Sequence, residues 1–363
     1  MNAPPSAAPP LRCVVPRADP SPLAKATSLV SVILARPDLP SALAFFRDFG
    51  LAEHSVAADA AFLRGVRSEA PCVELVRGPA RYVGLRFAVG SRAELERLAE
   101  AAGSSLEAGD EALGGERVRL EDPDGMVVEV VHGTRPLPPL VPAARPGTNG
   151  PEAQPRVNAT VRLAHAPPAV AKLGHTVLGV RRFEETVRWY QRHLGLIVSD
   201  AQLLPDDPVP VVAFLRCDRG PIPTDHHTLA IGSAIDLGHL HTAFELDGVE
   251  DVVRAHALLR ERGFKHTWGI GRHILGSQVF DYWRDPYGDL FEHYADGDRF
   301  DASVPTGYHA FGGDSLHQWG PAPTADMVGK IPTLHRAATL ARRLSSDDDL
   351  TPSRLKRLLA AAG

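Results

Sequence analysis

The chain has 363 residues, of which 44% are hydrophobic and 23% are charged, and its formal net charge is -5. This length suits two globular domains, and the small negative charge excludes a general basic surface for nucleic acid. No apolar run approaches the roughly 20 residues that cross a bilayer, and the three cysteines are far apart with no C-x-x-C pair, so a cytoplasmic protein with no membrane partner is expected.

The first third of the chain predicts one α+β domain. Residues 1–27 contain many prolines and no apolar signal-peptide core, so we expect a disordered leader. Residues 31–51 then predict a strand and a helix, and residues 82–103 predict another strand and helix. Ser91 and Glu94 form a capping-box signal at the start of that second helix. With the turn and strand of EDPDGMVVEVV, these elements predict a domain over residues 28–133.

A proline-rich segment, residues 134–170, predicts an extended linker, and after it the same order of elements returns. Residues 175–196 repeat the first strand and helix, and residues 239–263 repeat the second strand and helix. RDPYGDLFEHY (residues 284–294) repeats the turn and the last strand. The repeat predicts a second domain over residues 171–297, so the fold class is α+β with four similar units in two domains.

Two further expectations concern helices of the second half. The inner stripe of the helix within residues 239–263 is expected to consist of Val249, Val252, Val253 and His256. In the C-terminal extension, residues 298–363, LTPSRLKRLLAAAG has Thr351 as an N-cap and Pro352 at the first helical position. These residues predict a short basic helix near the end of the chain.

The two halves differ most in histidine content. Ten histidines lie between residues 175 and 293, and two lie between residues 31 and 132. Ser31 stands where the second half has His175, and the region of Gly84 stands where it has His241. Since both halves must satisfy similar folding demands, the extra histidines indicate chemistry in the second half.

The extra histidines include a set suited to a metal. His175 opens the first strand of one unit, and Glu292, at the position of Glu129 in the first half, lies on the last strand after the DPYG turn. A second histidine would come from the strand that carries both His239 and His241, which strand alternation places on one face. Two histidines and one carboxylate leave open positions on a non-haem Fe(II) or Mn(II) ion. Three more histidines are interpreted as hydrogen-bonded structural residues: His193, His256 and His266.

The second half resembles a known family. The resemblance is carried by the motifs GHTVL (174–178), HHTLA (226–230), HTAF (241–244), GRH (271–273) and FDYWRDPYGDLFEHY (280–294). In this order and spacing they resemble the two-domain, type I extradiol catechol dioxygenases of the vicinal oxygen chelate superfamily. The match covers roughly residues 28 to 300 and is weaker in the first half, while HQWGPAP (317–323) is also similar to the tail of this family.

The resemblance implies paired βαβββ modules, with a metal-free domain over residues 28–133 and a catalytic domain over residues 171–297. It implies that the metal ligands are His175, His241 and Glu292, and thereby selects His241 over His239. It also implies that His227 is the acid–base histidine and that the bound catechol contacts His273 and Tyr282.

The implied reaction uses O2 and Fe(II), with Mn(II) as the alternative ion, to open the ring of a catechol or bicyclic diol to a semialdehyde. A homo-oligomer is expected. Two other readings stay open: a glyoxalase-like metal-dependent isomerase or lyase, and a non-catalytic aromatic-binding protein of the same superfamily. The HHTLA and GRH motifs have no clear purpose in the isomerase, and a simple binding cleft needs no convergent metal ligands.

Overall fold

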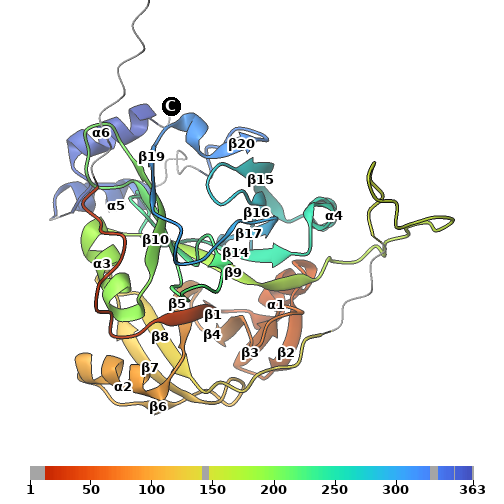
Figure 1. Cartoon of the computed structure of the whole chain (residues 1–363), viewed down its shortest axis with the longest axis horizontal. Coiled ribbons are helices and arrows are strands. Elements are labelled where there is room, and N and C mark those ends of the chain that lie inside the picture. Colours follow the sequence, from red (N-terminus) through yellow and green to blue (C-terminus); the bar gives the residue numbers. More distant parts are fainter. Residues whose placement is uncertain (1–12, 141–146, 328–333, 347, 362–363) are drawn as a thin grey trace, which may run out of the picture.

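The computed structural model describes residues 13–140, 147–327, 334–346 and 348–361. Each half of the chain builds one mixed β-sheet, and in Figure 1 the first sheet lies below the second. The first sheet has eight strands in the order β2-β3-β4-β1-β5-β8-β7-β6. The second has ten strands in the order β19-β10-β11-β13-β9-β14-β17-β16-β15-β20, and β12 pairs separately with β18.

The order of elements confirms the predicted α+β class with four βαβββ modules. The first half consists of β1 (Ala26–Arg36), α1 (Leu39–Asp48), β2 (Ala52–Val56), β3 (Ala60–Arg64), β4 (Val73–Arg77), β5 (Arg81–Val89), α2 (Arg92–Ala101), β6 (Glu107–Ala108), β7 (Glu116–Glu121) and β8 (Val127–His132). The second half begins with β9 (Val170–Gly179), α3 (Phe183–Leu194), β10 (Ile197–Leu203), β11 (Val212–Arg216), β12 (Thr224–Asp225) and β13 (Leu229–Gly232). It continues with β14 (Gly238–Leu246), α4 (Val249–Glu261), β15 (Lys265–His273), β16 (Val279–Arg284) and β17 (Leu290–Ala295).

The local sequence correctly predicted where α2 begins. For α4, the predicted buried face was wrong. α2 has the predicted capping box, in which Ser91 and Glu94 each accept the other's backbone N–H. In α4, however, Val249 is 39% and Val253 is 51% exposed. The buried stripe is instead Val252, Ala255, Leu258 and Leu259. The helix is rotated in this way because the two leucines bury more apolar area against the sheet than two valines of the first turn would.

The two halves share one hydrophobic core. Phe45 and Phe46 of α1 pack against Phe291 of β17, with ring centroids 5.8 and 5.1 Å apart. A buried ion pair also crosses between the halves, since Arg36 of β1 lies 2.8 Å from the carboxylate of Asp285. The sheet that carries the histidines is therefore held by the first half of the chain.

The two DPxG turns repeat one device. One carboxylate oxygen of Asp285 accepts the backbone N–H groups of Tyr287 and Asp289, while the other bonds to Arg36 of the first half. In the first half, Asp122 caps its own turn in the same way and accepts the hydroxyl of Tyr190 from the second half. Each turn thus fixes its own loop and links it to the opposite half.

Part of the expected leader is ordered. Residues 1–12 lie outside the described residues, but residues 13–25 run along the second half, where Val14 donates to the carbonyl of Pro208 at 2.9 Å and Val198 donates to Arg17 at 2.8 Å. Val15 is only 3% exposed. For residues 13–27 the expectation of disorder was therefore wrong, because the segment pairs with a distant part of the chain and Ala26 already begins β1.

The C-terminal extension contributes more than the predicted short helix. β18 (Arg299–Phe300) pairs with β12, β19 (Gly307–Ala310) pairs with β10, and β20 (His317–Trp319) pairs with β15, after the 3-10 turn η1 (Gly313–Ser315). Two helices follow, α5 (Leu334–Leu344) and α6 (Pro352–Ala361). The start of α6 confirms the prediction, since the hydroxyl of Thr351 accepts the backbone N–H of Arg354 at 3.2 Å. None of the helices in the described ranges is long and apolar enough to cross a membrane.

Candidate metal centre

Three adjacent strands bring His175, His241 and Glu292 together. In the sheet, Ala243 of β14 pairs with His175 of β9 on one side and with Glu292 of β17 on the other. The Nε2 atoms of His175 and His241 lie 3.3 and 3.4 Å from Oε2 of Glu292. Two atoms that each bind one metal ion at about 2.1 Å are roughly 3 Å apart when the angle between them is near 90°. These spacings fit a shared ion.

The burial and charge of the three residues also fit a metal. His175 is 2% exposed and Glu292 is 0% exposed. Among the residues that the structure describes, neither carboxylate oxygen of Glu292 has a hydrogen-bond partner. Leaving a buried carboxylate without partners is costly, and a bound cation removes that cost.

The protonation states suit metal ligands as well. Burial would raise the pKa of Glu292, but the imidazoles of His175 and His241 outweigh it and hold this pKa well below its usual range. Burial lowers the pKa of His175, which keeps the ring neutral and able to donate a lone pair. One anionic oxygen and two imidazole nitrogens are a donor set for Fe(II) or Mn(II).

His239 does not share the face of His241. A β-bulge lies between them in the pairing of β14 with β9, and a bulge interrupts the alternation of side chains along a strand. The His239 ring stacks on Tyr82 of the first half at 4.2 Å, and its Nε2 lies 2.9 Å from the hydroxyl of Thr242. The strand-alternation argument was therefore wrong at this position, and His239 belongs to the contact between the two halves.

The structure places the other three predicted site residues around the same centre. The ring of His227 lies 4.0 Å from that of His175, and the ring of Tyr282 lies 5.2 Å from that of His241. Nε2 of His273 lies 3.0 Å from the hydroxyl of Tyr282 and 3.8 Å from Oε1 of Glu292. All six residues thus face one buried region of the second sheet.

The tautomer of His273 follows from its contacts. Its Nδ1 lies 2.8 Å from the carbonyl oxygen of Leu316, which can only accept, so Nδ1 carries the hydrogen. Nε2 is then the acceptor for the hydroxyl of Tyr282. Burial lowers the pKa of His273 to about 4 and raises that of Tyr282 well above its usual value. Both side chains are therefore neutral at physiological pH in the metal-free protein.

A second group of similar residues is hydrogen-bonded in a different way. Asp281, which is fully buried, accepts from Nε2 of His266 at 2.8 Å, from Nδ1 of His256 at 3.1 Å and from the indole of Trp283 at 2.6 Å. These are hydrogen-bond lengths, and both carboxylate oxygens have partners. The predicted structural role of His256 and His266 agrees with this network, and that of His193 agrees with its 2.9 Å contact to the carbonyl of Trp189.

The first half fills the equivalent place with a guanidinium group. Strand pairing aligns Ser31 with Arg86 and Arg86 with Glu129, just as His175, Ala243 and Glu292 are aligned in the second half. Arg86 donates to Ser31 at 2.9 Å and to Glu129 at 2.5 Å. Sequence reasoning missed Arg86, although an arginine two residues after Gly84, in a half that also carries the glutamate Glu129, was a usable signal.

Gly84 is also confirmed as the counterpart of His241. Gly84 pairs with Ile33, which is two residues after Ser31 on β1. In the same way, His241 pairs with Val177, which is two residues after His175 on β9. A Cβ atom at Gly84 would lie 2.3 Å from the carbonyl oxygen of Val127, so the backbone leaves no room for a side chain. The first half therefore offers neither histidine of the second half.

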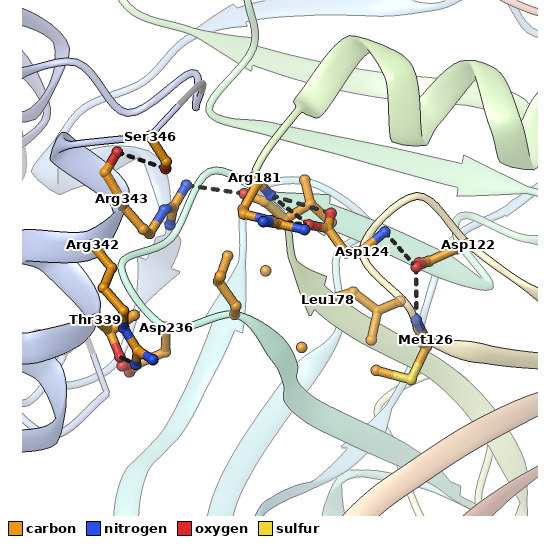
Figure 2. A pocket seen from close by; sticks show the side chains of 14 residues that line it. Asp122, Asp124, Met126, Leu178, Arg181, Asp236, Thr339, Arg342, Arg343 and Ser346 are labelled. Atoms are coloured by element: carbon orange, nitrogen blue, oxygen red, sulfur yellow. Dashed lines mark hydrogen bonds and ion pairs between the residues drawn. The ribbon is translucent and has the colours of Figure 1, made fainter.

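A cavity of about 440 Å³ is separate from this centre, since none of the six residues above lines it. Figure 2 shows its walls, where Arg181 is paired with Asp124 and where Arg343 of α5 reaches towards Val180. Because Arg343 donates to the carbonyl of Val180, this cavity lies where α5 attaches to the second half of the chain.

Comparisons with known proteins agree with this geometry. The model of the Glyoxalase/Bleomycin resistance protein/Dioxygenase superfamily matches residues 172–293. Metapyrocatechase 2 of Cupriavidus necator is 32% identical over 293 residues, which are 78% of this chain and 86% of that protein.

Two solved structures share the fold. The Mn(II)-bound glyoxalase from Novosphingobium aromaticivorans has a TM-score of 0.69 at 24% identity and covers 86% of this chain and 96% of its own. The homoprotocatechuate 2,3-dioxygenase from Brevibacterium fuscum, in complex with 3,4-dihydroxyphenylacetate, has a TM-score of 0.70 at 17% identity and covers 86% of this chain and 94% of its own.

The fold and the His-His-Glu set define a metal-binding protein with paired βαβββ modules. Since the relation to metapyrocatechase extends over most of both proteins, the chain belongs to the extradiol ring-cleaving dioxygenases of the Glyoxalase/Bleomycin resistance protein/Dioxygenase superfamily.

Proposed function

We propose that this chain uses O2 to open a catechol-type ring beside its hydroxyl-bearing carbons, with an ion held by His175, His241 and Glu292. The observation that carries the proposal is the buried Glu292 carboxylate. Neither of its oxygens has a hydrogen-bond partner within the described ranges, while two imidazole nitrogens lie 3.3 and 3.4 Å from Oε2. We propose Fe(II) as the ion and Mn(II) as the alternative, because the same donors suit both.

When bound, the ion supplies open positions for the two diol oxygens and dioxygen, and its charge lowers the pKa of a bound hydroxyl. We assign His273 and Tyr282 to the diol. The Leu316 carbonyl holds His273 with Nε2 as an acceptor, so the His273–Tyr282 pair can accept or donate a hydrogen bond at a phenolic oxygen.

Aromatic and apolar side chains pack around His273 and Tyr282. The Trp268 ring is stacked with Tyr282 at 5.5 Å, and the Phe280 ring is stacked with His273 at 4.1 Å. Leu316 and Met327 of the C-terminal extension pack on the same cluster. Since the Brevibacterium enzyme binds 3,4-dihydroxyphenylacetate, we propose that a catechol ring is the unit recognised here, in a one-ring or a bicyclic diol.

We assign His227 to acid–base work. It is 3% exposed, and burial, followed by the neighbouring histidines, lowers its pKa well below the usual value. The ring is therefore neutral and can take up a proton from the substrate and return it to the oxygen that leaves. A positioned acid–base group of this kind contributes about 100- to 10,000-fold in rate.

The test combines metal analysis with oxygen uptake on catechol, followed by a screen of diols for yellow ring-opened product. We expect His241→Ala to lose the metal, and His227→Ala to keep it and lose turnover. His193→Ala, whose ring bonds to a backbone carbonyl away from the site, is the control and should keep both. Metal without oxygen uptake on any diol would favour the glyoxalase-type isomerase, and absence of metal in the wild type would favour a binding protein.

The remaining expectations stay proposals. We propose that residues 28–133 form a metal-free domain, that residues 134–170 link it to the metal-binding domain at 171–297, and that residues 298–363 are a C-terminal extension with a short helix. A cytoplasmic location, a homo-oligomeric state and the absence of nucleic-acid or membrane partners also remain predictions, which fractionation and light scattering of the purified protein can check.

A further inference from the structure

A line of hydrogen-bonded side chains lies behind His227. Its Nδ1 atom is 3.0 Å from Nδ1 of His226, and Nε2 of His226 is 2.6 Å from Oδ2 of Asp200. The other carboxylate oxygen of Asp200 is 2.8 Å from Nε2 of His309. The line therefore joins β10, the segment between β12 and β13, and β19 of the C-terminal extension.

His226 is held on every side. It is 1% exposed, and its ring packs edge-on against Phe300 at 5.2 Å and in a tilted arrangement against Phe214 at 5.7 Å. Its backbone N–H donates to Asp298 at 2.9 Å, and its carbonyl accepts the hydroxyl of Ser199 at 2.5 Å. The ring therefore has one orientation in which to bridge Asp200 and His227.

The contacts determine where the hydrogens lie. Burial would raise the pKa of Asp200, but the hydrogen bonds from His226 and His309 hold it below its usual value, so the group is a carboxylate. A carboxylate only accepts, and Nε2 of His226 therefore carries a hydrogen. With the hydrogen of His226 on Nε2, its Nδ1 is the acceptor for the Nδ1–H group of His227, 3.0 Å away. This leaves Nε2 of His227 free of hydrogen.

We propose that Asp200 and His226 are positioning residues for ring cleavage, which hold His227 in the tautomer and orientation whose Nε2 can take a proton. The inference rests on the acid–base role of His227 in the proposed function. Asp200 acts through His226 and touches no ligand of the metal in the described part of the chain. The same logic applies to any imidazole whose second nitrogen is fixed by a hydrogen bond.

The C-terminal extension completes this arrangement. β19 pairs in parallel with β10, which places Gly307 beside Asp200 and His309 beside Gln202. A Cβ atom at Gly307 would lie 2.0 Å from Oδ1 of Asp200 and 2.6 Å from Nε2 of His309. The carboxylate and the His309 ring can therefore meet only because residue 307 has no side chain.

The first test compares variants of the metal-loaded enzyme. An asparagine accepts on one atom only, so Asp200→Asn cannot accept from both His226 and His309. We expect its kcat to fall about 10- to 100-fold, the usual effect of losing a group that orients an active-site ligand, with KM and metal content unchanged. Gly307→Ala, which displaces the carboxylate without removing it, should lower kcat by a smaller factor.

The matched control is His266→Gln. It removes a part-buried histidine–aspartate bond, 2.8 Å from Nε2 of His266 to Asp281, in a network that does not include His227. Its kcat should be retained. An unchanged kcat in Asp200→Asn would overturn the proposal, and so would metal loss in that variant or an equal fall in the control, because both would indicate a merely structural role.

A second readout does not depend on turnover. In the full-length protein loaded with zinc, 15N chemical shifts of the imidazoles should show His226 protonated at Nε2 and His227 protonated at Nδ1. Asp200→Asn should change this pattern, and His227→Ala identifies the resonance. If the wild type cleaves no diol, the proposed function fails, while the shifts still decide the tautomers; hydrogen on Nε2 of wild-type His227 would overturn the inference by itself.

Discussion

Removing Arg86 tests the idea that a guanidinium group in the first half stands where the second half binds a metal. Arg86 is 1% exposed and bonds to three carboxylates, Glu129, Glu74 and Asp110, as well as to Ser31. Arg86→Met keeps much of the apolar stem and removes the charge. Glu129, itself 1% exposed, then loses its central partner.

The cost of this change can be worked out from the contacts. Removing one partner of a buried ion pair destabilises a protein by roughly 3–5 kcal/mol. Arg119 and Arg117 remain 2.8 and 3.5 Å from Oε1 of Glu129, so the loss should be at the lower end, about 3 kcal/mol.

The effect should also depend on pH. Burial would raise the pKa of Glu129, but Arg86 and the other arginines hold it below its usual value of 4.5. The stability from this lowered pKa is fully present above about 4.5 and is lost as the pH falls through the folded value. The difference between wild type and Arg86→Met should therefore be largest at neutral pH and shrink in acid.

The assay is urea unfolding of the metal-free protein, with the free energy of unfolding measured for Arg86→Met and for the double variant Arg86→Met/Glu129→Gln. The double variant should regain part of the loss, since the most deeply buried of the three carboxylates, Glu129, no longer carries a charge without its central partner. Both should still bind the catalytic metal. A loss below about 1 kcal/mol, the value of an exposed pair, or a double variant less stable than the single one would refute the reasoning.

Three further predictions concern the buried cysteines, the N-cap of α6 and a glycine beside a metal ligand. Burial raises the thiol pKa of Cys72 to about 11 and of Cys217 to about 12, so neither should react with Ellman's reagent at mildly alkaline pH until urea unfolds the chain. Thr351→Ala should lower the free energy of unfolding by about 1 kcal/mol through loss of the N-cap of α6, whereas Thr351→Ser should not. Gly174→Ala would place a Cβ atom 2.3 Å from the hydroxyl oxygen of Tyr294, next to a metal ligand, so a metal titration should show weaker binding; unchanged affinity would contradict this.

The arrangement of the modules was predictable because it depends on local sequence patterns, and these patterns occur in both halves of the chain. The alternation of strands with helices, the DPxG turns and the glutamate that follows each turn can be read without knowing which strands pair. The register observed for Glu129 and Glu292 agrees with that alignment. The N-cap of α6 was likewise encoded in adjacent residues, Thr351 and Pro352.

What could not be predicted depends on contacts between distant residues. The bulge that turns His239 away from His241 arises from the pairing of β14 with β9. Leu240, the residue between the two histidines, does not predict a bulge. The order of residues 13–25 comes from bonds to partners such as Pro208, almost 200 residues further along. Asp200 was missed for the same reason, since its importance lies in its distance to His226.

The path of the N-terminal segment has a consequence for how the polypeptide can be divided. Residues 13–25 belong to the first half yet bond to the second, and the phenylalanines of α1 are buried against β17, while residues 147–166 between the halves are largely exposed. A single cut in that exposed stretch would break the covalent chain without separating the two fragments. The gene could thus be split there into two open reading frames whose products reassemble into a nicked enzyme, which would give a direct route to mixing halves from different relatives.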